Sequence, residues 1–277
     1  MKDRIAITLD AGLLTLVDSK VGAQLQNRSQ AIEHFLRLGL FGHAKLAGLI
    51  MVSAEHQERV LAFAGSGPSG SKKAKKGNKR ATTSVQRDEH AGNADAQPLI
   101  SRQTRALADA GCQRIIIVTQ DGPQLKRLID TIAKNNAQVV TRDVKGTAQV
   151  IAAAGEAGID SPFFALGGDI SFSCSLAAMM EYHLRHGKVA TMGLISGPEP
   201  TKAGCAMLSG DAITHFEERP SKADSYVINA GIYCFSPTIF SFIGPKDISL
   251  ERHVFPRLAE AGQLMGWFVP GEYRHVG

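Results

Sequence analysis

The chain has few cysteines, no long apolar run and no excess of acidic residues. Its four cysteines, at positions 112, 174, 205 and 234, show neither close pairing nor metal-ligand spacing, which argues against a disulfide scaffold and suits a reducing compartment. The apolar run Ala47–Val52 is too short to cross a bilayer. Residues 1–4 are not followed by the long apolar segment of a signal peptide. We therefore expect a cytoplasmic protein that does not associate with membranes.

Positive charge is unevenly distributed. The 277 residues carry a formal net charge of +5, and much of this excess lies in the lysine-rich run 72–80. The run belongs to a Gly-, Ser-, Ala- and Lys-rich stretch, residues 65–96, that has no hydrophobic period. Such a composition buries too little apolar surface to offset chain entropy, so we interpret it as a mobile loop or linker. The alternatives are an arm on a DNA backbone and a loop that holds a triphosphate.

The beginning of the chain predicts a strand followed by two helices. Residues 4–9 alternate in polarity, and Asp10 is expected to cap a helix over residues 11–21. Four apolar side chains share one face of that helix: Leu13, Leu14, Val17 and Val21. Ser29 is expected to cap the second helix. Because these short elements cannot bury a core alone, we expect a homodimer or a higher even oligomer, with two strands paired as an antiparallel ribbon.

This pattern resembles the ribbon-helix-helix DNA-binding domain. In that family the ribbon enters the major groove, so the resemblance implies that Arg4, Ala6 and Thr8 face base edges. It also implies that the first turn of the second helix, with Arg28 and Ser29, holds a backbone phosphate. The alternative is a small dimerisation module that never contacts nucleic acid.

The rest of the chain alternates between strand and helix patterns. Strands are expected at residues 114–119, 137–141 and 163–166, and helices at residues 123–134 and 148–157. The sequence does not identify the first strand of this sheet, because residues 45–53 and 59–64 both fit a strand pattern. We predict an α/β sheet with helices on both faces. In such sheets ligands bind beyond the carboxyl ends of the strands, where Asp169 falls.

The segment 225–237 predicts a buried strand with an unusual interruption. Asn229 and Gly231 stand among apolar residues, where a packed strand favours neither residue type. A polar side chain beside a bare backbone suits a hydroxyl-rich ligand. A β-bulge with a satisfied asparagine is the alternative.

Several motifs between residues 146 and 277 occur in a fixed order. They are Gly146-Thr-Ala148, Phe164-Ala-Leu-Gly-Gly-Asp169, Phe216-Glu-Glu-Arg-Pro220, Asn229-Ala-Gly-Ile-Tyr233, Ser249-Leu-Glu251 with Phe255-Pro256, and Tyr273-Arg-His-Val-Gly277. In order and spacing this segment resembles the NTP:sugar-1-phosphate nucleotidyltransferases. The resemblance implies a Rossmann-like three-layer fold. It also implies attack by a sugar-1-phosphate oxygen on the α-phosphorus of a nucleoside triphosphate, with release of pyrophosphate.

The resemblance assigns roles to individual residues. Asp169 matches the first carboxylate that holds Mg2+ and is the main catalytic candidate. Gly146 and Thr147 match the turn beside the nucleotide base, with Gln149 placed to contact the base edge. Glu218 and Asn229 match residues that hold the sugar, and Arg219 replaces a lysine that contacts its phosphate. Three further substrate-binding candidates lie inside the matched motifs: Gly168, Gly231 and Glu251.

The chain also departs from the family pattern. The glycine-rich turn that ends in Gly-Thr-Arg and the following Pro-Lys-Pro lysine are not intact, and Lys72 or Lys73 could supply only the missing charge. His275 replaces the second metal carboxylate. Because Mg2+ prefers oxygen ligands, its site on Asp169 would be weakened, or would accept manganese or zinc.

Two functional hypotheses follow. The first is a DNA-binding, transcription-regulating dimer, with residues 1–44 as the ribbon-helix-helix domain and residues 45–277 as a sensor of a nucleotide or sugar phosphate. The second is an active nucleotidyltransferase that forms a nucleotide-sugar. We favour the first, because loss of both phosphate and metal groups removes transition-state stabilisation.

Overall fold

The computed structural model describes residues 8–18, 21, 27–32, 46–62, 97–133 and 137–276. The predictions for Arg4, Ala6, Lys72 and Lys73, and for the stretch 65–96, therefore lie outside the described residues. Along the described parts of the chain, no helix is long and apolar enough to cross a membrane.

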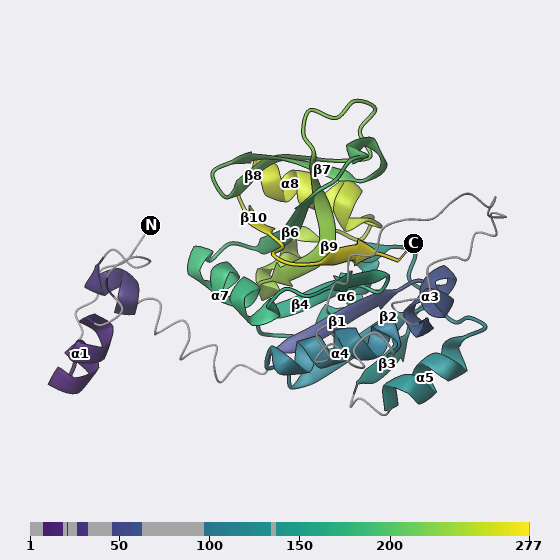
Figure 1. The fold of residues 1–277 in the computed structure, drawn as a ribbon, viewed down its shortest axis with the longest axis horizontal. Coiled ribbons are helices and arrows are strands. Elements are labelled where there is room, and N and C mark those ends of the chain that lie inside the picture. Colours follow the sequence, from purple (N-terminus) through teal and green to yellow (C-terminus); the bar gives the residue numbers. More distant parts are fainter. Residues whose placement is uncertain are drawn as a thin grey trace, which may run out of the picture.

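A nine-stranded sheet forms the centre of the larger part of the chain (Figure 1), in the order β3-β2-β1-β4-β9-β6-β10-β8-β7. Strands β1 to β4 are parallel to their neighbours in this group, whereas β9 is antiparallel to both β4 and β6. The strands are β1 (Ala47–Val52), β2 (Arg114–Thr119), β3 (Gln138–Thr141), β4 (Phe163–Gly167), β6 (Ala190–Ser196), β7 (Gly204–Ser209), β8 (Ala212–Glu218), β9 (Val227–Phe235) and β10 (Leu264–Phe268).

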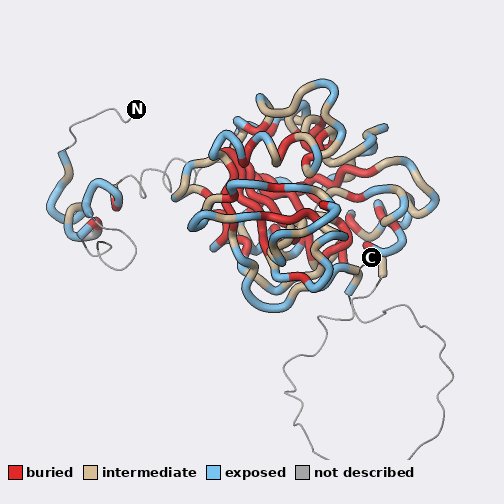
Figure 2. Tube along the Cα trace, turned by 90° about the horizontal axis from the view of Figure 1, so that it is seen from above, coloured by how far each residue is buried: buried red, intermediate tan, exposed pale blue. Residues whose placement is uncertain are grey.

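Helices cover both faces of this sheet, as predicted. One face packs against α6 (Thr147–Glu156) and α8 (Phe255–Glu260). The other packs against four helices: α3 (Gln57–Leu61), α4 (Leu99–Asp109), α5 (Leu125–Ala133) and α7 (Leu176–His186). Successive strand residues point to opposite faces, so Leu49 enters the first core and Ile50 the second. Figure 2 shows the resulting concentration of buried residues in the middle of the domain.

The structure identifies the first strand of the sheet. Residues 47–52 form β1, which lies between β2 and β4. The competing assignment of residues 59–64 to a strand is wrong, because residues 57–61 form helix α3 and bury Gln57 and Val60 on one side. The position that follows the first strand is thus Ser53 rather than the glycine-rich run that begins at residue 65.

A small cluster near the beginning of the chain tests the predicted caps. Asp10 caps α1 (Ala11–Asp18), since its Oδ1 accepts hydrogen bonds from the backbone N–H groups of Gly12 and Leu13 at 2.8 and 3.0 Å. The cap predicted at Ser29 is wrong. Asn27 performs this role, because its side chain accepts from the Gln30 N–H at 3.0 Å. Helix α1 also leaves Leu13 half exposed, although Val17 and Ala31 are buried.

Candidate active site

A cavity of 550 Å³ lies at the carboxyl ends of β1 and β4. Because β1 and β4 are parallel, their carboxyl ends lie side by side. The antiparallel β9 brings Asn229 and Gly231 to the same edge. Nine of the sequence candidates line this cavity: Gly146, Thr147, Asp169, Glu218, Arg219, Asn229, Gly231, Glu251 and His275.

Two candidates lie elsewhere among the described residues. The Gln149 side chain turns back, and its Oε1 accepts from the Lys145 N–H at 2.9 Å, so it lines a separate cavity of 250 Å³ on the far side of the turn. Gly168 is buried beneath the site, where its N–H donates to the Met51 carbonyl at 2.8 Å. A Cβ at Gly168 would lie 2.9 Å from that same carbonyl oxygen, so this glycine permits the close approach of two backbones.

Asp169 is the centre of a carboxylate–imidazole cluster. Its Oδ2 lies 3.2 Å from Nε2 of His275 and 3.3 Å from Nδ1 of His56. Strand β11 (Tyr273–His275) pairs with β5 (Ile170–Phe172) and places His275 opposite Ile170. Burial by itself would raise the pKa of Asp169, but the hydrogen bond and charge of His275, together with His56, outweigh burial and lower that pKa. The hydrogen bond to Asp169 correspondingly raises the pKa of His275.

The turn that carries Asp169 is held in place by Gln103, a residue that sequence reasoning missed. The buried Gln103 side chain of α4 donates from Nε2 to the carbonyls of Gly167 and Ile170, both at 2.8 Å. These bonds bracket Asp169 on both sides in the chain. His56 was also missed; the signal was its place four residues after the end of β1, which is visible only once β1 is assigned.

The turn of residues 146–148, called here the nucleotide-side turn after its predicted role, is held by the segment that contains Glu251. The Thr147 hydroxyl donates to Glu251 Oε2 at 2.7 Å and accepts from the Leu250 N–H at 2.9 Å. The Ala148 N–H donates to the Ile248 carbonyl at 3.0 Å. Glu251 lies on a π-helical turn, Leu250–Val254, and Ser249 donates to the same Oε2 at 2.6 Å. Thr147 and Glu251 therefore join two segments that are far apart in the sequence.

Strand β9 combines an irregularity in its pairing, as the predicted bulge requires, with two residues that line the cavity. The Asn229 amide is satisfied internally, since Oδ1 accepts from the Gly231 N–H at 2.9 Å and Nδ2 donates to the Tyr233 hydroxyl at 2.7 Å. The pairing with β6 also shifts register between Met192 and Leu194. Gly231 has a φ of 70°, a left-handed conformation that favours glycine, and both it and Asn229 line the cavity.

Two residues at the end of β8 complete the other side of the cavity. Burial, followed by the negative charge of Glu251, raises the pKa of Glu218. Arg219 has a φ of 52° and is the only non-glycine residue in the described chain with a positive φ. Such a conformation costs an L-residue about 1–2 kcal/mol. Strain of this kind is concentrated at functional sites, and here it falls on the predicted sugar-phosphate contact.

Comparison with known proteins identifies the family. The Nucleotidyl transferase family model matches residues 89–270. The chain belongs to the nucleotidyl transferase family. It is 31% identical over 189 residues to the mannose-1-phosphate guanylyltransferase catalytic subunit beta of Drosophila pseudoobscura pseudoobscura, covering 65% of this chain and 51% of that protein. It is 30% identical over 193 residues to the subunit of the same name from Danio rerio, with 65% and 53% covered. The chain thus spans about half the length of these curated relatives.

A solved structure shares the fold of this nucleotidyl transferase. It is a Bacillus anthracis protein assigned as a glucose-1-phosphate thymidylyltransferase and crystallised with sucrose. The TM-score is 0.63 at 16% identity, over 83% of this chain and 89% of that one. At this identity the likeness supports the α/β nucleotidyltransferase fold alone.

The comparisons do not support a ribbon-helix-helix domain or DNA binding, because the family match begins at residue 89. Of the predicted DNA-contacting residues, the structure describes Thr8, Arg28 and Ser29. Arg28 is held by Asp18 through Nε and Nη2 at 2.6 and 2.7 Å, which engages the guanidinium within the chain. Thr8 and Ser29 are exposed.

Members of this family typically use Mg2+, so the residues around Asp169 can be tested for that ion. Mg2+ demands near-octahedral oxygen coordination. Within the described ranges, no group of three or more His, Cys, Asp or Glu side chains is placed to hold a metal ion. Oδ2 of Asp169 is already in contact with the imidazoles of His56 and His275. These side chains do not fit a magnesium ion held by the protein alone.

Proposed function

We propose that this chain is a nucleotidyltransferase that joins the nucleotidyl group of a nucleoside triphosphate to a sugar 1-phosphate. A phosphate oxygen of the sugar 1-phosphate forms a bond to the α-phosphorus, and the bond from that phosphorus to the bridging oxygen of pyrophosphate breaks. The observation that carries the proposal is one cavity lined both by Gly146 and Thr147 of the 146–148 turn and by the residues matched to the sugar side. The names of the relatives support this class of substrate.

The reaction asks for positioning more than for covalent chemistry by the protein. We propose that the 146–148 turn contacts the nucleotide, and that Arg219 neutralises the sugar phosphate. Glu218 and Glu251, two carboxylates within the cavity, would accept hydrogen bonds from sugar hydroxyls. Asp169 and the imidazoles beside it would lie next to the reacting phosphates. Lys145 and Lys202 add positive charge to the lining.

Pyrophosphate release by the purified chain tests this proposal. The assay would combine the common nucleoside triphosphates with a panel of sugar 1-phosphates, in Mg2+ and then in Mn2+. We expect turnover that falls by at least about a hundredfold in Arg219→Ala, because it removes a charge contact to a transferring group. The exposed Asp211→Asn, in the turn between β7 and β8, serves as the control. No turnover with any pair would refute the enzyme, and stabilisation by one ligand alone would then favour a sensor.

We also propose that residues 1–44 form a module separate from residues 45–277. In its support, Val17 and Ala31 form a small cluster with Leu9, Val21 and Ile32 that shares no residue with either sheet core. Because elements this short bury little apolar surface by themselves, we propose that a second copy completes their core. Light scattering should give an even oligomer for the full chain and a monomer after removal of residues 1–44. Equal oligomeric states would refute the dimerising role.

A further inference from the structure

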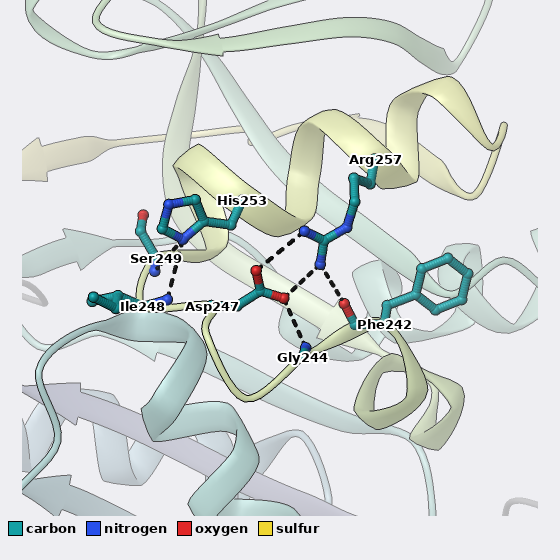
Figure 3. Close-up of polar contacts among 7 residues, drawn as sticks. All are labelled: Phe242, Gly244, Asp247, Ile248, Ser249, His253 and Arg257. Carbon is teal, nitrogen blue, oxygen red and sulfur yellow. Dashed lines mark hydrogen bonds and ion pairs between the residues drawn. The ribbon is translucent and has the colours of Figure 1, made fainter.

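An ion pair outside the cavity anchors the segment that holds the nucleotide-side turn. Arg257 projects from α8 toward Asp247, which lies in the loop before the π-helical turn (Figure 3). Arg257 donates from Nη1 to Asp247 Oδ1 at 3.2 Å and from Nη2 to Oδ2 at 2.6 Å. Nη2 also donates to the Phe242 carbonyl at 2.7 Å, and Asp247 Oδ2 accepts from the Gly244 N–H at 2.7 Å. The Arg257 guanidinium thus binds both ends of the loop 242–247.

The backbone that follows Asp247 is held by an imidazole. Nδ1 of His253 accepts from the backbone N–H groups of Ile248 and Ser249, at 3.1 and 3.2 Å. Figure 3 shows both bonds beside the Asp247–Arg257 pair. Because Nδ1 accepts, the proton of the neutral ring lies on Nε2. Side chains from the π-helical turn and from α8 therefore set the path of residues 247–249.

This path leads directly to the nucleotide-side turn. The Ile248 carbonyl accepts from the Ala148 N–H, and the Leu250 N–H donates to the Thr147 hydroxyl. Gly146 packs so closely on Ile248 that a Cβ would overlap its carbonyl oxygen. Residues 248–250 therefore cannot slide past the turn. If they shifted, their backbone contacts to residues 146–148 would break.

Neither member of the ion pair lies at the surface of the cavity. Asp247 and Arg257 are both absent from its lining, and Asp247 borders the separate cavity of 250 Å³. The Asp247 side chain is only 13% exposed, whereas the Arg257 side chain is 46% exposed. The carboxylate therefore depends on groups of the protein, rather than on water, for its hydrogen bonds. The Arg257 hydrogen bond, ahead of the other causes, lowers the pKa of Asp247.

We infer that Asp247 and Arg257 are positioning residues that set the geometry of the nucleotide-side turn through Ile248 and Leu250. This inference rests on the proposed function where it concerns nucleotide affinity. Its structural step, from Arg257 to the Ala148 N–H, is independent of that function. A purely structural ion pair would contribute to stability without changing the turn in the folded state.

The test uses the full chain with graded variants of one side chain. Arg257→Met keeps an apolar stem and removes every donor, whereas Arg257→Lys keeps the charge but loses the fork. Asp247→Asn provides a milder change if Arg257→Met does not fold. Arg185→Met is the matched control, because Arg185 pairs with Glu181 on the exposed side of α7, away from the cavity.

Amide hydrogen exchange under native conditions is the first readout. In Arg257→Met we expect exchange at Ala148 and Leu250 to accelerate about tenfold, since their acceptors lose support. Arg257→Lys should restore part of this protection, and Arg185→Met should leave it unchanged. A lower melting temperature with wild-type exchange at both amides would overturn the inference.

Nucleotide affinity is the second readout. The probe is whichever of ATP, GTP, CTP, UTP and dTTP binds the wild type most tightly in calorimetry. We expect its Kd to rise about fivefold in Arg257→Met and less in Arg257→Lys. An unchanged Kd beside accelerated exchange would overturn the positioning role. If no nucleotide binds the wild type, the proposed function fails, and the exchange result decides the structural step by itself.

Discussion

Gly146→Ala offers a sharp test of the nucleotide-side turn. Glycine is required at this position by lack of space for a side chain, not by the backbone conformation. Its φ of 179° is extended backbone that any residue adopts. An added Cβ, however, would overlap the Ile248 carbonyl oxygen and lie 2.8 Å from Ile248 Cγ2. A carbonyl held by the Ala148 N–H cannot rotate away as a flexible side chain would. The two backbones must therefore separate by at least about 0.6 Å.

Such a separation would stretch the Ala148–Ile248 hydrogen bond from 3.0 Å to about 3.6 Å, beyond the range of a hydrogen bond. Overpacking of this kind costs about 1–3 kcal/mol. If half of that cost falls on the binding geometry, nucleotide Kd rises about twofold to twelvefold. Calorimetry would measure the affinity, and urea unfolding the stability.

A control separates binding from stability. Gly266→Ala in β10 would place a Cβ 2.5 Å from Leu194 Cδ1, so it also overpacks the fold, but it lies outside the cavity lining. We expect Gly266→Ala to lower stability and leave nucleotide affinity unchanged. Wild-type affinity in Gly146→Ala, or an equal loss in Gly266→Ala, would refute the argument that this close approach shapes the nucleotide site.

The remaining predictions concern the charged side chains of the cavity. Arg219→Gly relieves the strain of a left-handed backbone, so the free energy of unfolding should stay the same or rise by up to about 1 kcal/mol. The same change should abolish sugar 1-phosphate affinity, because the guanidinium is lost. Retained affinity in calorimetry would contradict the role of the guanidinium. His275→Asp adds an oxygen ligand beside Asp169 and should increase Mn2+ binding in paramagnetic resonance; unchanged binding would show that Asp169 does not attract the ion. Asp169 has a lowered pKa and His275 a raised one, so their pair stabilises the fold fully between the ordinary values of 3.8 and 6.5. That stability is lost as pH falls through the lowered pKa of Asp169, or rises through the raised pKa of His275. His275→Gln should therefore flatten the decline of the melting temperature above pH 6.5, and an unchanged profile would count against the pair.

Sequence patterns predicted the elements of the sheet because hydrophobic periodicity is a local property. The strand expected at residues 114–119 is β2, and the helix expected at residues 148–157 is α6, displaced by one residue. Periodicity could not choose the first strand, since two short apolar runs fitted equally well. That choice depends on which run lies between β2 and β4, a tertiary property. The histidine at position 56 was missed for the same reason.

Side-chain direction was the other limit of sequence reasoning. Gln149 lies in the first turn of α6, where the family resemblance places a residue near the base. Its amide instead closes a local bond to Lys145, and no periodicity distinguishes these two rotamers. The N-cap at Ser29 failed similarly, because Asn27, two positions earlier, is an equally good capping residue and begins the helix sooner. The DNA-binding hypothesis rested on this same short region.

The charge of the cavity bears on whether departures from the family pattern remove activity. Its described lining contains four carboxylates, Glu55, Asp169, Glu218 and Glu251, against three permanent cations, Lys145, Lys202 and Arg219. The two phosphorylated substrates of the proposed reaction would need more positive charge than this balance supplies. The Leu99 N–H donates to the Ala62 carbonyl at 3.1 Å, so the chain leaves and re-enters the described fold at one place, beside α3 and close in sequence to His56. The lysines at positions 72 and 73 belong to the intervening residues. The hypothesis that they supply the missing charge therefore has an electrostatic reason, and loss of the family's arginine is not by itself an argument against turnover.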